Sequence, residues 1–172
     1  MAKTIRKRFK APGASDSVKA RGFFRLQIVE DDNGKSKVVG DSGWVKNQIT
    51  NSGFQNGITS CLGGVAGSSQ ITYAALGTGT VPGATATSLN GEVTDAANNR
   101  LAVTASTIAS KTVQFAFTLA SGAYTTTHSI ANVGLFQTST TNAGTLYAGQ
   151  TYASSQLQSN QAVNGTYQIS FS

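Results

Sequence analysis

The sequence predicts a mainly β protein: an antiparallel β-sandwich or barrel of jelly-roll or immunoglobulin-like type, with one short helix and an extended basic N-terminal arm. Several segments alternate apolar and polar residues with a period of two, which is typical of half-buried strands. Turn-forming residues separate these segments at short intervals, as in antiparallel sandwiches and barrels. The arm is indicated by charge, because seven of the 13 Lys and Arg residues lie among the first 22.

The chain is predicted to contain one domain preceded by the arm. Its 172 residues suit a single domain with a real core. Residues 1–21 form the expected arm, because they hold few large apolar side chains and Pro12-Gly13 interrupts any helix. Residues 22–172 form the expected β-rich domain.

Alternation places the strands. Residues 22–30 put Phe24, Leu26 and Ile28 on one face, and the turn at 31–34 contains Asn-Gly, which favours a tight hairpin with 35–40. The most regular alternation is in 111–120, which predicts that Phe115 and Phe117 are buried, with Leu135, Tyr147 or Ile169 as neighbours. Further strands are predicted at 44–50, 70–80, 128–138, 144–153 and 165–172, with a turn cluster at 154–164.

One short helix is predicted over 52–63. Phe54, Ile58, Cys61 and Leu62 recur at helical spacing, with Asn51 or Ser52 as a cap and two glycines after the last turn. Cys61 is the only cysteine, so no intramolecular disulfide can form, and its small and apolar neighbours indicate a buried residue. The polar segment 88–100 is predicted as a loop with at most one helical turn.

Composition favours a protein that packs against others. Only 12% of the residues are charged, while 22 Thr and 19 Ser supply neutral polarity. The net charge of +6 equals that of the first 22 residues, so the rest of the chain is neutral. Charges are depleted at the cores of protein interfaces, so a neutral surface of this kind suits assembly. A turn-rich β protein without such a role is the simpler alternative.

The arm is predicted to anchor the protein on an acidic partner. A protein surface and nucleic acid are both possible, since Lys and Arg contact phosphates without a defined fold. A membrane is disfavoured, because Pro12-Gly13 breaks an amphipathic helix and no run of residues is apolar enough to span a bilayer. A merely solubilising tail is the alternative. The expected anchoring residues are Lys3, Arg6, Lys7, Arg8, Lys10, Lys19 and Arg21.

No residue pattern predicts an enzyme or a cofactor site. His128 is the only histidine, and nothing around it resembles a nucleophile motif. Glu92 and Asp95 are three residues apart in a loop and, with Arg100 nearby, indicate an ion-pair cluster more than an acid and base pair. The Gly-rich segment 77–83 lacks the Lys of a phosphate loop and indicates a close backbone approach.

Three segments resemble small structural proteins of tailed bacteriophages. Residues 42–58 (SGWVKNQITNSGFQNGI) are similar to a Trp-Lys-Asn-x-Ile-Thr-Asn segment of those proteins. Residues 73–93 (YAALGTGTVPGATATSLNGEV) resemble their ALGTGT stretch, and residues 128–152 contain their GLF and Gly-Thr-Leu-Tyr-Ala strands. The resemblance covers roughly 40–172. It departs at Asn132 and Gly149, where the family often carries an acid and an Arg, so no ion pair is expected there.

The resemblance implies a non-enzymatic virion protein: a capsid decoration (cement) or head-fibre base protein, bound to the major capsid protein or another virion protein. A tail or adaptor component is the first alternative, and a nucleic-acid-binding module is the second. A homo-oligomer is expected, either a trimer, which the resemblance implies, or a lattice. The strands at 144–153 and 165–172 lack Lys and Pro, which predicts exposed sheet edges that a neighbouring subunit covers.

Overall fold

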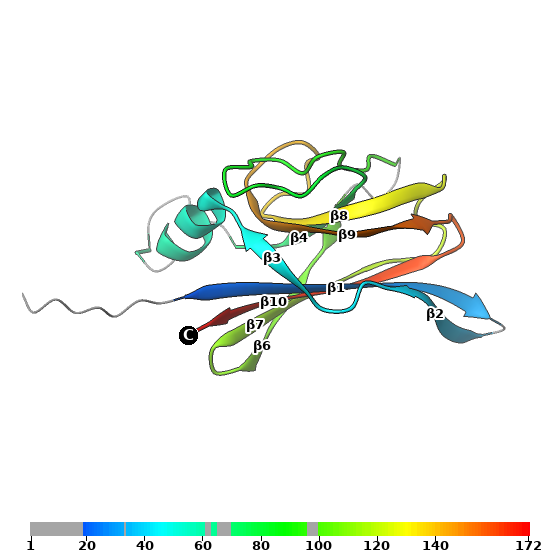
Figure 1. Cartoon of the computed structure of the whole chain (residues 1–172), viewed down its shortest axis with the longest axis horizontal. Helices are drawn as coiled ribbons and strands as arrows, with labels where there is room; N and C mark the ends of the chain where they lie inside the picture. The colour runs from blue at the N-terminus through cyan, green and yellow to red at the C-terminus, as the bar shows by residue number, and fades with distance from the viewer. Residues whose placement is uncertain (1–18, 33, 61–62, 65–69, 96–99) are drawn as a thin grey trace, which may run out of the picture.

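Ten antiparallel strands form two packed layers in the computed structural model (Figure 1). The structure describes residues 19–32, 34–60, 63–64, 70–95 and 100–172. The elements are β1 (Ala20–Asp32), β2 (Lys35–Asp41), β3 (Val45–Ile49), the short helix η1 (Gly53–Thr59), β4 (Tyr73–Gly77), β5 (Leu101–Ala102), β6 (Thr104–Ala109), β7 (Thr112–Leu119), β8 (His128–Phe136), β9 (Leu146–Leu157) and β10 (Ala162–Phe171).

The two layers join into a nearly closed barrel. One layer has the order β2/β3-β1-β10-β7-β6, and the other has the order β3-β9-β8-β4-β5. β3 pairs with β1 through one part and with β9 through another, so it links the layers on one side. On the other side β5 pairs with β4 and β6 with β7, with Val103 alone between β5 and β6. The predicted mainly β fold with one short helix is therefore confirmed.

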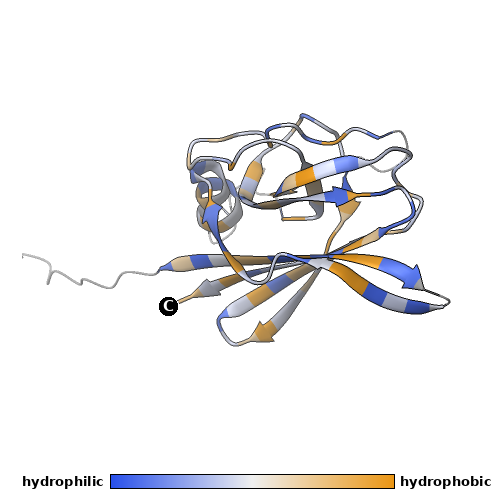
Figure 2. Ribbon diagram, turned by 45° about the vertical axis from the view of Figure 1, so that its right-hand side comes forward, coloured by the Kyte–Doolittle hydropathy of each residue, from blue (hydrophilic) through white to orange (hydrophobic). Residues whose placement is uncertain are grey.

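The core lies between the layers, where buried apolar side chains of both meet. Hydrophobic and hydrophilic residues alternate along several of the strands in Figure 2. From β1, Phe24, Leu26 and Ile28 point inward, as their alternation predicts. The opposite layer contributes a largely aliphatic set, consisting of Leu76, Ile130, Val133, Leu135 and Leu157. Burying this apolar surface is the main force that holds the layers together.

Phe115 and Phe117 of β7 are buried, with 7% and 4% of their surface exposed. They belong to one cluster with Leu135 and Ile169, two of the neighbours that the sequence predicts. The Phe117 ring lies against Gly165, where an added Cβ would come within 2.0 Å of the ring. The ring thus occupies the space that a side chain on β10 would otherwise need.

The hairpin of β1 and β2 forms as predicted, with Gly34 in the left-handed region at φ +79° and its N–H donating to Asp31 Oδ1 at 2.7 Å. The segment 101–109, which has no clear alternation, forms β5 and β6. The predicted turn cluster at 154–164 is wrong in extent, because β9 continues to Leu157 and β10 begins at Ala162. Long pairing with neighbouring strands overrides the turn-forming residues there.

The helix forms, and the described residues of its predicted face differ: Ile58 is partly buried and lines the apolar pocket described below, whereas Phe54 is 41% exposed. The helix also packs through Gly53 and Gly57, which both lie against Tyr147. A Cβ at Gly57 would come within 2.6 Å of the Tyr147 ring. Neither predicted cap forms: the Thr50 hydroxyl accepts the Gly53 N–H at 2.9 Å instead. Cys61 and Leu62 lie outside the described residues.

The prediction of free edges at 144–153 and 165–172 is wrong. β9 pairs with β8 and β3, and β10 pairs with β1 and β7. Among the described strands, the outer sides of β2, β6 and the two-residue β5 remain without a partner strand. β2 carries Lys35 and Lys37, and β6 is short and irregular beside Ile108. Both features discourage pairing with another chain.

We predict that Phe117→Ala lowers the free energy of unfolding by about 3–5 kcal/mol, because the vacated ring volume leaves a cavity over Gly165. Urea unfolding of the purified protein measures this. Thr118→Ala is the matched control on the outward face of the same strand and should cost no more than about 1 kcal/mol. Similar stability of the two variants would contradict the strand assignment.

Candidate functional site

Arg100 and Glu92 form a fully buried ion pair. Arg100 Nε donates to Glu92 Oε1 at 2.6 Å and Nη2 donates to Oε2 at 3.0 Å, while both side chains have 0% exposed surface. The second terminal nitrogen donates to the carbonyls of Thr138 and Ala143, each at 2.9 Å. The guanidinium also lies 3.6 Å from the centre of the Phe136 ring. These contacts satisfy a charge that would otherwise be costly to bury.

Close backbone contacts position Glu92. It forms an isolated bridge with Gly77, and the next N–H, of Val93, donates to Leu76 at 2.9 Å. A Cβ at Gly77 or Gly79 would meet Asn132 or the backbone of Asn90 at 2.1 and 2.5 Å. The Gly-rich segment therefore serves a close backbone approach, as its sequence indicates.

The two positions that depart from the phage proteins have structural roles of their own. Asn132 is fully buried, and its amide donates to the carbonyls of Thr80 and Asn90 at 3.1 and 2.8 Å. Gly149 lies against Pro82 and the backbone of Val133, so a Cβ there would come within 2.5 Å of the proline ring.

Asp95 does not join the Arg100 pair but binds the loop before β8. Its carboxylate accepts the Thr125 N–H at 2.8 Å and the Thr125 hydroxyl at 2.7 Å, and it lies 3.1 Å from His128 Nε2. The hydrogen bond from the Thr125 hydroxyl, followed by that with His128, holds the pKa of Asp95 well below its usual range. The predicted cluster of Glu92, Asp95 and Arg100 is thus two separate sites.

The geometry around His128 does not assemble a nucleophilic relay. Such a relay needs the carboxylate on one ring nitrogen and the hydroxyl on the other. Here the Thr126 hydroxyl and Asp95 both lie 3.1 Å from the same nitrogen, Nε2. The ring packs edge-on against Tyr124, with centres 5.1 Å apart. The run of threonines before His128 was the sequence signal for this loop-closing cluster.

The described residues contain no group of three or more His, Cys, Asp or Glu side chains that could hold a metal ion. In the same part of the chain, no helix is both long enough and apolar enough to cross a membrane.

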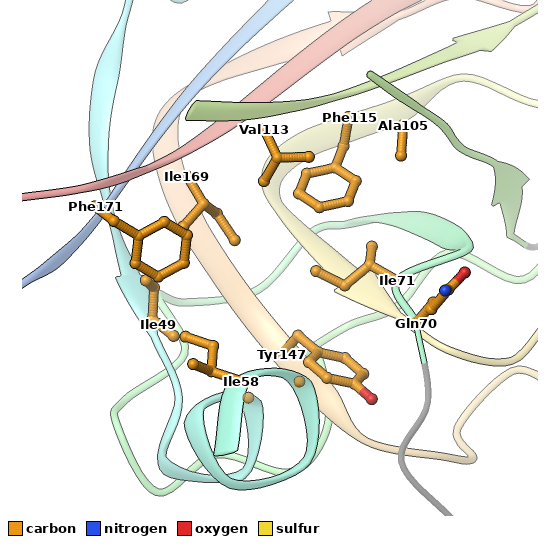
Figure 3. A pocket seen from close by; sticks show the side chains of 12 residues that line it. Ile49, Ile58, Gln70, Ile71, Ala105, Val113, Phe115, Tyr147, Ile169 and Phe171 are labelled. Carbon is orange, nitrogen blue, oxygen red and sulfur yellow. The ribbon is translucent and has the colours of Figure 1, made fainter. Parts of the chain in front are cut away.

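An apolar pocket of about 310 Å³ opens between the layers beside η1 (Figure 3). Its walls come from both layers and from the helix. Among the residues that Figure 3 labels, only Gln70 and Tyr147 carry polar side-chain atoms. Phe171 of β10 lies in this wall and pairs with Ala20, the first residue of β1. The pocket is therefore at the end of the sandwich where β1 begins. The main apolar lining residues are Ile49, Ile58, Ile71, Val113, Phe115, Ile169 and Phe171.

Two of the predicted anchoring residues fall within the described part of the chain. The backbone of Lys19 exchanges hydrogen bonds with Ser172 at 2.8 and 2.9 Å, and Arg21 is an exposed residue of β1 opposite Ser170. This backbone pairing holds the start of the described chain to the end of β10. The other predicted anchoring residues, Lys3, Arg6, Lys7, Arg8 and Lys10, lie outside the described residues.

Comparison of the chain with protein-family models, with curated proteins and with solved structures finds no match.

We predict that Glu92→Gln lowers the free energy of unfolding by about 3–5 kcal/mol, because it leaves Arg100 buried without a counter-charge. Asp41→Asn is the matched control, since it breaks the exposed pair with Arg25 and should cost about 1 kcal/mol or less. Denaturant unfolding of both variants measures the difference. Equal costs would show that the Arg100 pair contributes no more than a surface pair.

Asp95 should make folding sensitive to acid. Because its pKa is lowered in the folded state, the stability it contributes is present above its ordinary pKa of about 4 and is lost as pH falls below that value. Asp95→Asn removes this linkage, so its melting temperature should fall less between neutral pH and pH ~2.5 than that of the wild type. Thermal melts at the two pH values test this, and an identical decrease in both proteins would contradict it.

Proposed function

We propose that this protein is a non-enzymatic structural component of a bacteriophage virion. In this proposal it is a capsid decoration or head-fibre base protein that binds the major capsid protein, or another virion protein, through its basic N-terminal arm. It acts as a homo-oligomer, either a trimer or a lattice of copies on the particle. The sequence resemblance over 40–172 supplies the virion class, and the trimer rests on that resemblance alone.

The observation that carries the proposal is the placement of charge. The carboxylate of Glu92 forms an ion pair with Arg100, and that of Asp95 accepts hydrogen bonds from the loop before β8. The remaining acids of the body lie on the β1–β2 hairpin, where Asp41 binds Arg25. The arm carries seven bases in its sequence against one carboxylate, Asp16. A protein built in this way has a charged anchor joined to a neutral body, which supports attachment to an acidic surface.

The described carboxylates also serve the fold. A glycosidase needs two carboxylates that face one cleft, and Glu92 is buried against Arg100 while Asp95 is held by backbone N–H groups and hydroxyls. Structural use of both groups supports a scaffold role over hydrolysis.

A tail or adaptor component is the second candidate, because the same phage segments occur in tail-associated proteins. Mass spectrometry of purified particles of the encoding phage, with copy number per particle, separates the two. A copy number that follows the capsid lattice supports decoration, and a low copy number that follows the tail symmetry supports the adaptor. Absence from the particle would overturn the proposal as a whole.

We predict that deleting residues 2–18 leaves the body folded and abolishes attachment to the particle. The body should fold because its strand pairing begins at Lys19 and Ser172. Circular dichroism and thermal melting test folding, and co-sedimentation with particles that lack the protein tests attachment. Attachment of the full chain should weaken with added salt, since salt screens exposed charges. Normal binding by the truncated protein would refute the anchoring role.

A further inference from the structure

Two lysines that are remote from the arm in sequence lie at the end of the sandwich where the arm begins. Lys46 of β3 is in register with Phe23 of β1, two residues beyond Arg21. Lys111 lies in the turn between β6 and β7, and its carbonyl accepts the N–H of Phe171 at 2.9 Å. Since Phe171 pairs with Ala20, this turn also lies beside the start of β1. Both lysines are exposed.

Strand register places Arg21 and Lys46 on one face. Phe24 and Leu26 of β1 point into the core, so the residues of opposite parity, Arg21 and Phe23, face outward. Residues directly opposite each other on paired strands share a face, so Lys46 faces outward with Phe23. We call Lys19, Arg21, Lys46 and Lys111 the basic end. It spans the adjacent strands β3, β1, β10 and β7, a width of about 14 Å.

The described acidic side chains lie away from this set. Glu92 and Asp95 are buried elsewhere, Asp41 binds Arg25 beside the middle of β1, and the other acids lie near the turn between β1 and β2. On that hairpin, Lys37 is in register with Glu30 and Lys35 with Asp32. The basic end therefore gathers four basic side chains, whereas the hairpin lysines lie opposite acids in register.

We propose that the basic end is a docking surface for a carboxylate-rich protein surface, and that Lys46 and Lys111 extend the arm's contact onto the folded body. This inference rests on the proposed function and names the chemistry of its partner. A rigid surface at the start of β1 restricts how the body can sit on the partner. The arm then supplies attachment, and the basic end supplies orientation.

The outward face beside the basic end favours protein over nucleic acid. Its amides and hydroxyls bond to one another, as in Gln168 to Gln114 at 3.0 Å and Thr112 with Ser170 at 2.8 Å. Phe23 of β1 lies on this face and is partly buried, and one exposed aromatic ring, Trp44, precedes Lys46 by two residues. Single-stranded nucleic acids are usually held by several exposed aromatic rings. A four-stranded sheet is also wider than the DNA major groove of about 12 Å, which admits a helix or a two-stranded ribbon.

The test compares two charge reversals in the full chain. Lys46→Glu with Lys111→Glu alters the basic end, and Lys35→Glu with Lys37→Glu makes the same change of net charge on the distant hairpin. Thermal melts establish that both variants fold. Binding to immobilised poly-glutamate at low salt should fall about tenfold for the first variant, from the loss of two exposed ionic contacts, and less than about twofold for the second.

Three outcomes decide the inference. A selective loss in the basic-end variant supports it. An equal loss in both variants would show that net charge alone governs binding and would overturn it. Tighter binding of a random-sequence DNA duplex than of poly-glutamate, lost in the same basic-end variant, would also overturn it in favour of nucleic acid. Both variants keep the arm, so this test is independent of the 2–18 deletion. If neither variant shows a selective loss while the deletion abolishes attachment, this inference is wrong and the proposed function stands.

Discussion

The buried ion pair of Arg100 and Glu92 is the interaction that holds the start of β5 to the rest of its layer. Arg100 stands directly before β5, the two-residue strand from which the chain passes through Val103 into the other layer. Four donor contacts hold its guanidinium against Glu92 and two loop carbonyls. An arginine cannot give up its charge, so a fold that buries one must bring all of these acceptors to the same place. The pair thereby fixes the point from which the chain crosses to the other layer.

Glycines set how closely the other parts approach that framework. Gly53 and Gly57 allow the helix to lie on Tyr147, and Gly165 allows the Phe117 ring to cross β10. At each place an added Cβ would meet its neighbour at less than 3 Å. These contacts are specific to shape, so they define the packing of a core whose aliphatic side chains alone would accept several arrangements.

The sequence predicts the fold well where one face of a strand is buried. β1 and β7 follow from strict alternation, because Phe24, Leu26, Phe115 and Phe117 all enter the core. β6 could not be predicted in this way, since all its side chains are exposed and it forms through pairing with β7. The glycine contacts of the helix were missed for a related reason. Glycine has no hydrophobic side chain, so spacing of apolar residues cannot indicate packing through Gly53 and Gly57.

The candidate site was predictable in part. An ion pair near Arg100 was expected from its neighbours in sequence, but the separation of Glu92 from Asp95 depends on which way a loop turns, and that is decided by Gly77 and Asn132. The sequence pattern also could not predict that Lys46 and Lys111 lie near the start of β1, because that proximity depends on which strands pair in the sheet. The charge distribution in the sequence predicts the arm, whereas strand pairing in the sheet defines the basic end at the start of β1.

The neutral and basic regions of this molecule arise because its few carboxylates are used in contacts away from the start of β1. A body with six acids uses one in a buried pair, one in a loop cluster and four on the β1–β2 hairpin, where three lie beside or opposite a base and Asp31 accepts the Gly34 N–H. Little negative charge remains to balance bases elsewhere, so those placed at the start of β1 act outward. A surface of this kind repels other copies through the same end and attracts carboxylates. Contacts between copies would then use the neutral faces and leave the basic end to a different, acidic partner.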